Sequence, residues 1–271
     1  MKLKLRSFRL IGAITLSAFL SSGTTTYAQQ TYSFGIVPQS NGTKLSRTWT
    51  PILQYLESKT GYKFRFSTAR NIPTFEQRLA KGKYDFAYMN PYHYVQYHNM
   101  AGYEAFAKAK NKRLKGILVV HKDSPYQTIK DLESKSFAFP SNAFAANQIP
   151  RAIFGQMGMS FDAKYVASHD SVYRNVAKGR YPAGGGVMRT FRNTSEEYRK
   201  ELRILWTSNG YTPHAFAVQP RVPADVVQTV LNAMLQMDQD PMGKRLLKSI
   251  RLKGIEIGNN QEWNDVRELN L

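Results

Sequence analysis

The chain has 271 residues, enough for one large or two modest domains, and a formal net charge of +19 at pH 7. It contains no cysteine, which excludes disulfides, thiolate nucleophiles, cysteine-ligated zinc and iron–sulfur clusters. Positive excess attracts anions and acidic surfaces. Two interpretations fit this positive charge. It can keep the protein soluble, with loose contact to anionic lipid headgroups, or it can steer a small anionic ligand toward its site. The basic residues are dispersed and no nucleic-acid-binding motif is present, so no nucleic acid partner is expected.

Residues 1–28 are typical of a signal peptide. Basic residues precede an apolar run at 10–20, and Thr26-Tyr27-Ala28 offers a small-x-small site, so cleavage is expected near Ala28. The apolar run is too short to span a bilayer. Removing the four basic residues of this leader leaves a net charge of +15. We expect an exported, periplasmic protein that is stabilised by its core alone.

Strand and helix patterns alternate after the leader. The first elements expected are a strand at 32–37, a helix at 46–59, a strand at 62–67, a helix from Pro73 to Gly82 and a strand at 84–89. This order is typical of a parallel α/β sheet. A helix at 92–100 and strands at 106–108 and 115–121 should follow, the last of them leaving the first lobe.

The second half of the chain continues the pattern. The elements expected there are strands at 136–139, 165–167, 202–207 and 216–218, and helices at 143–157, 196–202, 225–237 and 242–250. Residues 79–84 and 176–181 are nearly identical, each with a helix end, a Lys-Gly turn and entry into an apolar strand. This echo suggests two similar α/β lobes. Such lobes place ligands where strands end and helices begin.

Several sequence blocks together resemble a known family. They lie at residues 49–56, 60–61, 79–87, 122–125, 129–139, 168–170, 176–179 and 204–208. In this order and spacing they are similar to the periplasmic substrate-binding proteins of phosphonate/phosphite-type ABC transporters, within the type II periplasmic-binding superfamily. The resemblance covers roughly residues 32–263. It implies the two-lobed α/β fold of that superfamily, with mixed sheets flanked by helices and a ligand cleft between the lobes.

The resemblance also implies how the chain is divided. Lobe 1 should comprise residues 29–120 and 205–271, and lobe 2 residues 121–204. The family fold implies two crossing strands between the lobes. No low-complexity linker is present, which indicates shared strands or short crossings rather than a flexible tether.

The pocket departs from the family's pattern. The family's Ser-Thr-Ser-Gly run, whose hydroxyls and amides hold the phosphonate oxygens, corresponds to Ala-Phe-Ala-Ala at 143–146. The family's carboxylates for a ligand amine fall near Arg189 and His214, whereas the family's histidine is retained as His169. A pocket that exchanges carboxylates for Arg and His should reject cationic amines and accept an additional anionic group. Aminoalkylphosphonate is therefore not expected as the ligand, and phosphate or phosphite is not favoured.

The candidate ligand-binding residues lie after strands or before helices. They are His169, Arg189, Ser141, Asn142, Phe144, Asn90, Tyr92, Gln39, Ser40, Tyr211 and His214. Some also fit other roles: Ser141 and Asn142 as a helix N-cap, and Arg189 as a solvent-facing residue beside Glu196. Phe144 suggests an apolar wall of the pocket.

No catalytic residue, cofactor or metal site is expected. The Ser-His-Asp run at 168–170 cannot form a triad from adjacent positions. His93 and His98 are not spaced as a helical zinc pair, and the three glycines at 184–186 lack the lysine of a phosphate-binding loop.

The expected function is that of a monomeric periplasmic solute-binding protein of an ABC-type uptake system. It should capture a small anion by hinge closure and present it to a membrane permease, with peripheral contact to the inner membrane. There are two alternatives. The protein could sense a ligand and dock onto a sensor kinase, or it could be an exported enzyme of transferase or hydrolase type.

Overall fold

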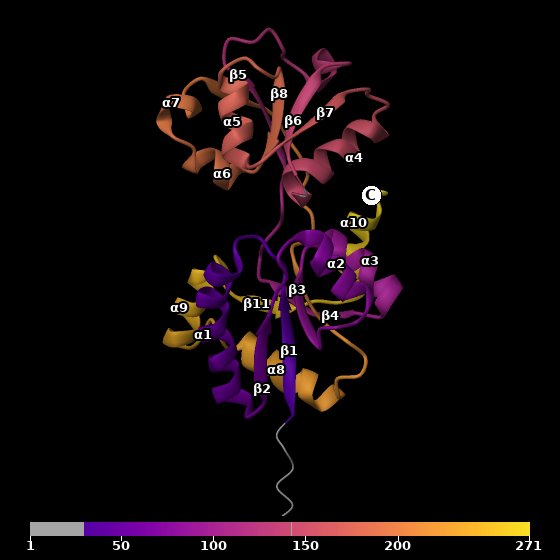
Figure 1. Ribbon diagram of the computed structural model, residues 1–271, viewed down its shortest axis with the longest axis vertical. Helices are drawn as coiled ribbons and strands as arrows, with labels where there is room; N and C mark the ends of the chain where they lie inside the picture. The colour runs from indigo at the N-terminus through magenta and orange to yellow at the C-terminus, as the bar shows by residue number, and fades with distance from the viewer. Residues whose placement is uncertain (1–29, 142) are drawn as a thin grey trace, which may run out of the picture.

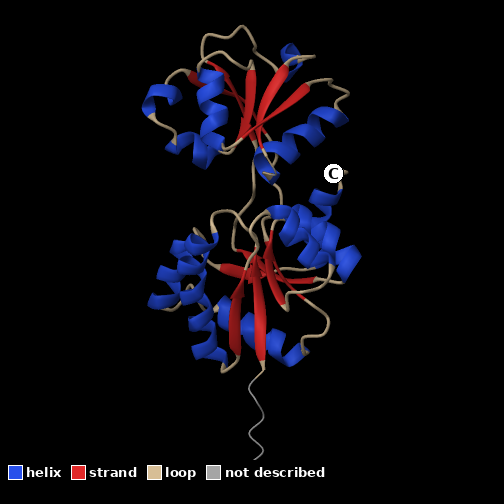
Figure 2. Cartoon of the chain, viewed as in Figure 1, coloured by secondary structure: helices blue, strands red, loops and turns tan. Residues whose placement is uncertain are grey.

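Two α/β lobes joined by a narrow waist make up the computed structural model, which describes residues 30–141 and 143–271 (Figure 1). Helices flank the sheet of each lobe (Figure 2). The expected signal peptide lies outside the described residues, as does Asn142. Within the described ranges, no helix combines the length and apolar character that a membrane crossing requires.

Lobe 1 is built on a six-stranded mixed sheet in the order β11-β4-β10-β3-β1-β2. Its strands are β1 (Thr31–Ile36), β2 (Lys63–Ser67), β3 (Phe86–Met89), β4 (Glu104–Ala109), β10 (Ala215–Val218) and β11 (Ile255–Ile257). Its helices are α1 (Gly42–Thr60), α2 (Ile72–Ala80), α3 (Pro91–Ala101), α8 (Ala224–Leu235), α9 (Pro241–Ser249), η3 (Asn260–Trp263) and α10 (Asn264–Arg267).

Lobe 2 is built on a five-stranded mixed sheet in the order β7-β6-β8-β5-β9. Its strands are β5 (Ile117–His121), β6 (Ser136–Pro140), β7 (Asp162–Val166), β8 (Ala183–Gly186) and β9 (Leu202–Thr207). Its helices are η1 (Ile129–Leu132), the π-helix η2 (Phe144–Gln148), α4 (Ile149–Gln156), α5 (His169–Ala177), α6 (Met188–Asn193) and α7 (Glu196–Arg199).

The core of lobe 1 is aromatic. Phe34 on β1 stacks on Phe86 of β3 with ring centroids 5.7 Å apart, and Trp49 of α1 packs against the same layer. Helix α1 begins where the Asn41 side chain accepts a hydrogen bond from the Lys44 amide, and it ends at a left-handed glycine. Burial of these rings fixes the strands whose carboxyl ends carry the candidate site residues.

The helix–glycine–strand echo is a structural repeat. Helix α2 ends before Gly82 at φ 58° and leads into β3, and α5 ends before Gly179 at φ 67° and leads into β8. A left-handed φ favours glycine at both turns. Strand β3 pairs in parallel with β1 and antiparallel with β10, as β8 does with β6 and β5. The two lobes therefore use the same unit at the same place in their sheets, which confirms the expectation.

The chain crosses between the lobes twice. Strands β5 and β9 both belong to the sheet of lobe 2, so the expected boundaries at 120/121 and 204/205 fall inside these strands. The crossing segments lie just outside them. Leu114 and Tyr211 exchange two backbone hydrogen bonds of 2.8 Å, and the Ser208 amide donates to the Gly116 carbonyl at 2.9 Å. We call residues 114–116 with 208–211 the hinge ribbon.

Candidate functional site

His214 is the centre of the candidate site on lobe 1. It directly precedes β10, and its ring stacks on Tyr88 of β3 with centroids 5.1 Å apart and planes 23° apart. The Gln39 side-chain nitrogen lies 2.6 Å from His214 Nε2. Gln39 follows β1 and is exposed, and its neighbour Ser40 is half-buried. The structure therefore brings together the two segments, after β1 and before β10, that the sequence proposed separately.

The environment keeps His214 neutral. Burial lowers the pKa of its imidazole to about 3, and the positive charge of Lys112 lowers it further in the same direction. A neutral ring has one N–H donor and one acceptor nitrogen. Since Gln39 occupies Nε2, the other nitrogen remains for a second partner.

Lys112 is a residue that the sequence analysis missed. It lies in the crossing segment between β4 and β5 and is half-buried. Burial lowers the pKa of its ammonium group, with a smaller contribution from Arg251. Within the described ranges it has no ion pair. A lysine between two strands reads as a solvated surface residue, because its burial comes from packing that no local pattern encodes.

Asn90 acts as a helix cap. Its Oδ1 accepts a 2.7 Å hydrogen bond from the His93 amide at the start of α3. The His93 ring is 1% exposed, and its Nε2 lies 3.0 Å from Glu76 of α2. The carbonyl oxygen of Asn90 is thus engaged, and its amide nitrogen is hydrogen-bonded to the His93 ring at 3.3 Å.

Tyr92 and Tyr211 belong to two other features of the structure. Tyr92 lines a surface groove of about 310 Å³ between α3 and the C-terminal segment. Tyr211 belongs to the hinge ribbon, and burial raises the pKa of its hydroxyl. These positions favour a role for Tyr211 in the crossing.

On lobe 2, His169 is the first residue of α5, after Ser168 at the N-cap, whereas the sequence placed it in the loop just before a helix. Its Nδ1 lies 3.1 Å from Thr190 Oγ1 on α6, and Tyr173 of α5 holds the same hydroxyl at 2.7 Å. Burial lowers the pKa of His169. This network fixes the ring at the point where α5 begins and α6 follows β8.

Arg189 is exposed on α6, one helix position before Thr190. The sequence offered Glu196 as an alternative partner, but Glu196 pairs with Arg199. Among the described residues, no carboxylate pairs with Arg189. Its exposed side chain is thus not neutralised by a carboxylate, and Thr190, the next residue, bonds to His169.

The predicted cap at Ser141 and Asn142 is wrong for Ser141. Its side chain caps no helix: the helical segment begins as η2 with Ala143 in the N-cap position and no side-chain cap. Phe144, expected as a pocket wall, is 5% exposed and belongs to the apolar cluster that contains the core of lobe 1. Asn142 lies outside the described residues.

Lobe 2 contains one group of metal-ligating side chains within the described ranges. The donor atoms of His121, Asp123 and Glu201 lie within 4.8 Å of one another. Glu201 already pairs with Lys122 at 3.0 Å, and the Asp123 amide donates to His121 Nδ1 at 3.3 Å. The cluster is accounted for as an ion-pair network at the ends of β5 and β9.

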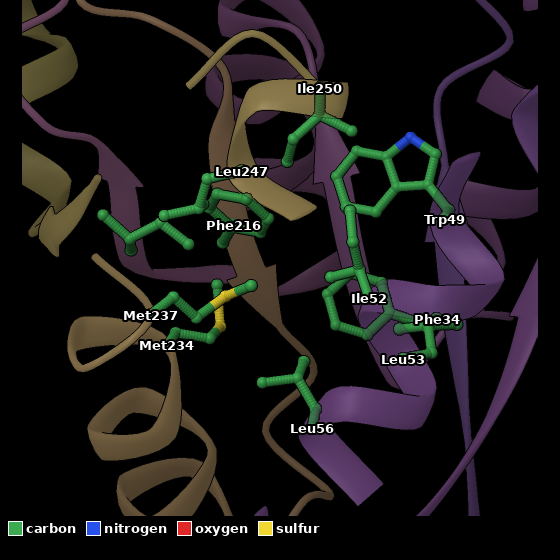
Figure 3. A pocket seen from close by; sticks show the side chains of 11 residues that line it. Phe34, Trp49, Ile52, Leu53, Leu56, Phe216, Met234, Met237, Leu247 and Ile250 are labelled. Carbon is green, nitrogen blue, oxygen red and sulfur yellow. The ribbon is translucent and has the colours of Figure 1, made fainter. Parts of the chain in front are cut away.

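A small apolar cavity lies inside lobe 1, between α1, α8, α9 and the sheet (Figure 3). Its volume of about 10 Å³ has room for roughly one water-sized sphere, and Phe34, Trp49 and Met234 are among its walls. Without polar groups it cannot hold an anion. It is a packing gap of the core.

These features define a class of protein. Two similar α/β lobes joined by a two-stranded crossing, with polar residues where strands end, are characteristic of periplasmic binding proteins.

The comparisons assign the family within that class. Residues 34–263 match the ABC transporter, phosphonate, periplasmic substrate-binding protein family, and the chain belongs to it. Members are substrate-binding proteins rather than enzymes.

Individual relatives are distant in sequence. The phosphonates-binding periplasmic protein of Escherichia coli is 24% identical over 226 residues, which cover 74% of this chain and 64% of that protein. The chain thus spans less than two thirds of its curated relative.

Solved structures show the same fold. A binding protein component of an ABC phosphonate transporter from Pseudomonas aeruginosa matches with a TM-score of 0.72 and 17% identity, covering 90% of this chain and 86% of that one. PhnD1 from Prochlorococcus marinus, in complex with methylphosphonate, matches with a TM-score of 0.75 and 16% identity, covering 90% and 98%.

Proposed function

We propose that this protein is the solute-binding component of an ABC-type uptake system and captures a phosphonate-like anion that carries a second anionic group. The observation that supports this most strongly is the charge of the site. Lys112 and neutral His214 lie on lobe 1, and His169 and Arg189 lie on lobe 2. Within the described ranges, no carboxylate bonds to any of these four side chains.

The proposed mechanism is closure about the hinge ribbon. The ligand contacts both lobes, so binding favours the state in which His169 and Arg189 approach Gln39 and His214. A helix start at His169 directs backbone amides toward an anion. The closed shape is then what a membrane permease recognises, while the protein remains a monomer with peripheral contact to the inner membrane.

The ligand class follows from the replaced carboxylates. An ammonium group would meet Lys112 and Arg189 without a counter-charge, which disfavours it. A ligand with a phosphonate at one end and a carboxylate at the other would satisfy cationic groups on both lobes. The match to a methylphosphonate-bound relative supports the phosphonate end.

Isothermal titration calorimetry with five anions tests this proposal. Phosphonoacetate should bind most tightly, methylphosphonate more weakly, and phosphate and sulfate more weakly still. 2-Aminoethylphosphonate should bind least. Tightest binding of 2-aminoethylphosphonate would contradict the ligand class, and absence of binding by all five would contradict the proposed function.

A further inference from the structure

Helix α4 has two apolar faces. Phe154 faces its own sheet, where its ring packs edge-on against Phe137 at 5.8 Å. The second face belongs to the apolar cluster that contains the core of lobe 1. Ile149, Ala152 and Ile153 form this face, and Phe144 and Ala145 of the preceding η2 belong to the same cluster; Ile153 packs against the core cluster of lobe 2 as well. We call these five residues, with Gln156, the interlobe seam.

The spacing of the seam shows that it is one continuous surface. Residues 145, 149, 152, 153 and 156 recur at three- and four-residue steps, which places them on one side of a helical segment. Ile149 is fully buried although it begins a helix at the edge of its lobe. A solvent-facing helix side would not bury an isoleucine. Ile149 packs within the apolar cluster, which is made mostly of lobe 1 residues and includes Leu114 and Tyr211 of the hinge ribbon.

Gln156 adds a polar contact at the far end of the seam. Its side-chain nitrogen donates to the Glu268 carbonyl, next to α10, at 2.8 Å. Among the described residues this is the one hydrogen bond that joins the lobes outside the hinge ribbon. Figure 1 shows α4 directly above α10 and the C-terminus.

The seam lies off the hinge ribbon, so rotation of one lobe must disturb it. Close-packed apolar contacts and a 2.8 Å hydrogen bond are lost or overpacked when their partners move. The proposed ligand-binding groups, in contrast, do not contact each other across the lobes. In the described part of the chain, no hydrogen bond or ion pair joins Gln39 or His214 of lobe 1 to His169 or Arg189 of lobe 2. Closure would therefore form the ligand contacts while it breaks the seam.

We propose that the interlobe seam is a latch that holds the ligand-free protein open and thereby sets its affinity. This rests on the proposed function. The apparent dissociation constant equals the intrinsic one divided by the fraction of closed protein. Weakening the latch should raise that fraction and tighten binding without any change at the ligand site.

Gln156→Ala tests the latch by affinity. Loss of one neutral hydrogen bond should tighten phosphonoacetate binding about three- to tenfold, as measured by calorimetry. Gln127→Ala, at an exposed position of the same lobe, is the matched control and should leave affinity unchanged. Unchanged or weaker binding by Gln156→Ala would overturn the proposal.

Ala152→Phe tests the latch without a ligand, because the larger ring overpacks the seam. The chain has no native cysteine, so spin labels at Thr43→Cys on α1 and Asn193→Cys on α6 report the distance between the lobes. Ala152→Phe should add a shorter-distance population in electron double resonance. An unchanged distribution would overturn the latch. Because this readout needs no ligand, it separates failure of the latch from failure of the proposed function.

Discussion

At the scale of single residues, His214 is defined by what surrounds it. Its ring is stacked on Tyr88 and bonded to Gln39. Burial and, to a smaller extent, the positive charge of Lys112 favour its uncharged form. The same burial links its protonation to the stability of the fold, because the unfolded chain does not share this environment.

We expect His214 to make stability depend on pH. The unfolded chain binds a proton near the ordinary pKa of 6.5, whereas the folded protein binds it only near 3. Stability from this residue is therefore complete above pH 6.5 and lost as the pH falls toward 3, by up to about 1.4 kcal/mol per pH unit. Urea unfolding between pH 7 and 5 should show a steeper decline for the wild type than for His214→Gln. Parallel curves would contradict this assignment.

Charge removal tests the two proposed cations. Lys112→Met and Arg189→Ala should each weaken phosphonoacetate binding at least about tenfold, because each removes a charge-assisted hydrogen bond. The controls are Lys115→Met in the same crossing segment and Arg192→Ala on the same helix, both at exposed positions. Unchanged affinity with unchanged melting temperature would remove the substituted residue from the site.

The sequence indicated the position of His169 but not the burial of Lys112, for physical reasons. A strand followed by an amphipathic run is a local pattern, and it places His169 between a strand and a helix. The lowered pKa of Lys112 comes from burial and, to a smaller extent, from Arg251, which is far along the chain. Phe144 likewise belongs to an apolar cluster made mostly of residues from the other lobe, which its local sequence does not indicate.

At the scale of elements, the sequence predicts the strand–helix alternation well and the start of α4 poorly. A single helix over 143–157 was expected, but the chain forms η2 and then α4. Pro150 explains the difference, because it lacks the N–H that would bond to the Ala146 carbonyl in an α-helix. That carbonyl instead faces Gly185 of β8, at a place where a Cβ would lie 2.0 Å away.

Gly185→Ala should therefore be destabilising. The new methyl would collide with the Ala146 carbonyl of η2 and with the Phe139 ring of β6 at 2.6 Å, so both η2 and the ring would have to shift. We expect a loss of about 1–3 kcal/mol in urea unfolding. Gly155→Ala in α4 is the control, since nothing lies within 4 Å of its Cβ, and it should be neutral or stabilising. Equal stability of the two variants would contradict this packing.

At the scale of the whole molecule, the lobes are the part that sequence alone described best. The repeated helix–glycine–strand unit predicted two similar halves, and both sheets contain it. How the two halves pack against each other was harder to predict from the sequence. Helix α4 has a second apolar face that belongs to the cluster of lobe 1. In the sequence, this face only makes the helix more hydrophobic and does not indicate what covers it.

The central claim is that the two lobes enclose one anion between them. A crystal structure of the protein with phosphonoacetate tests it most directly. We expect the ligand to contact Arg189 and His169 on lobe 2 and Lys112 or His214 on lobe 1, with the Gln156–Glu268 hydrogen bond broken. A ligand held by one lobe alone, or bound in the groove beside Tyr92, would contradict the account.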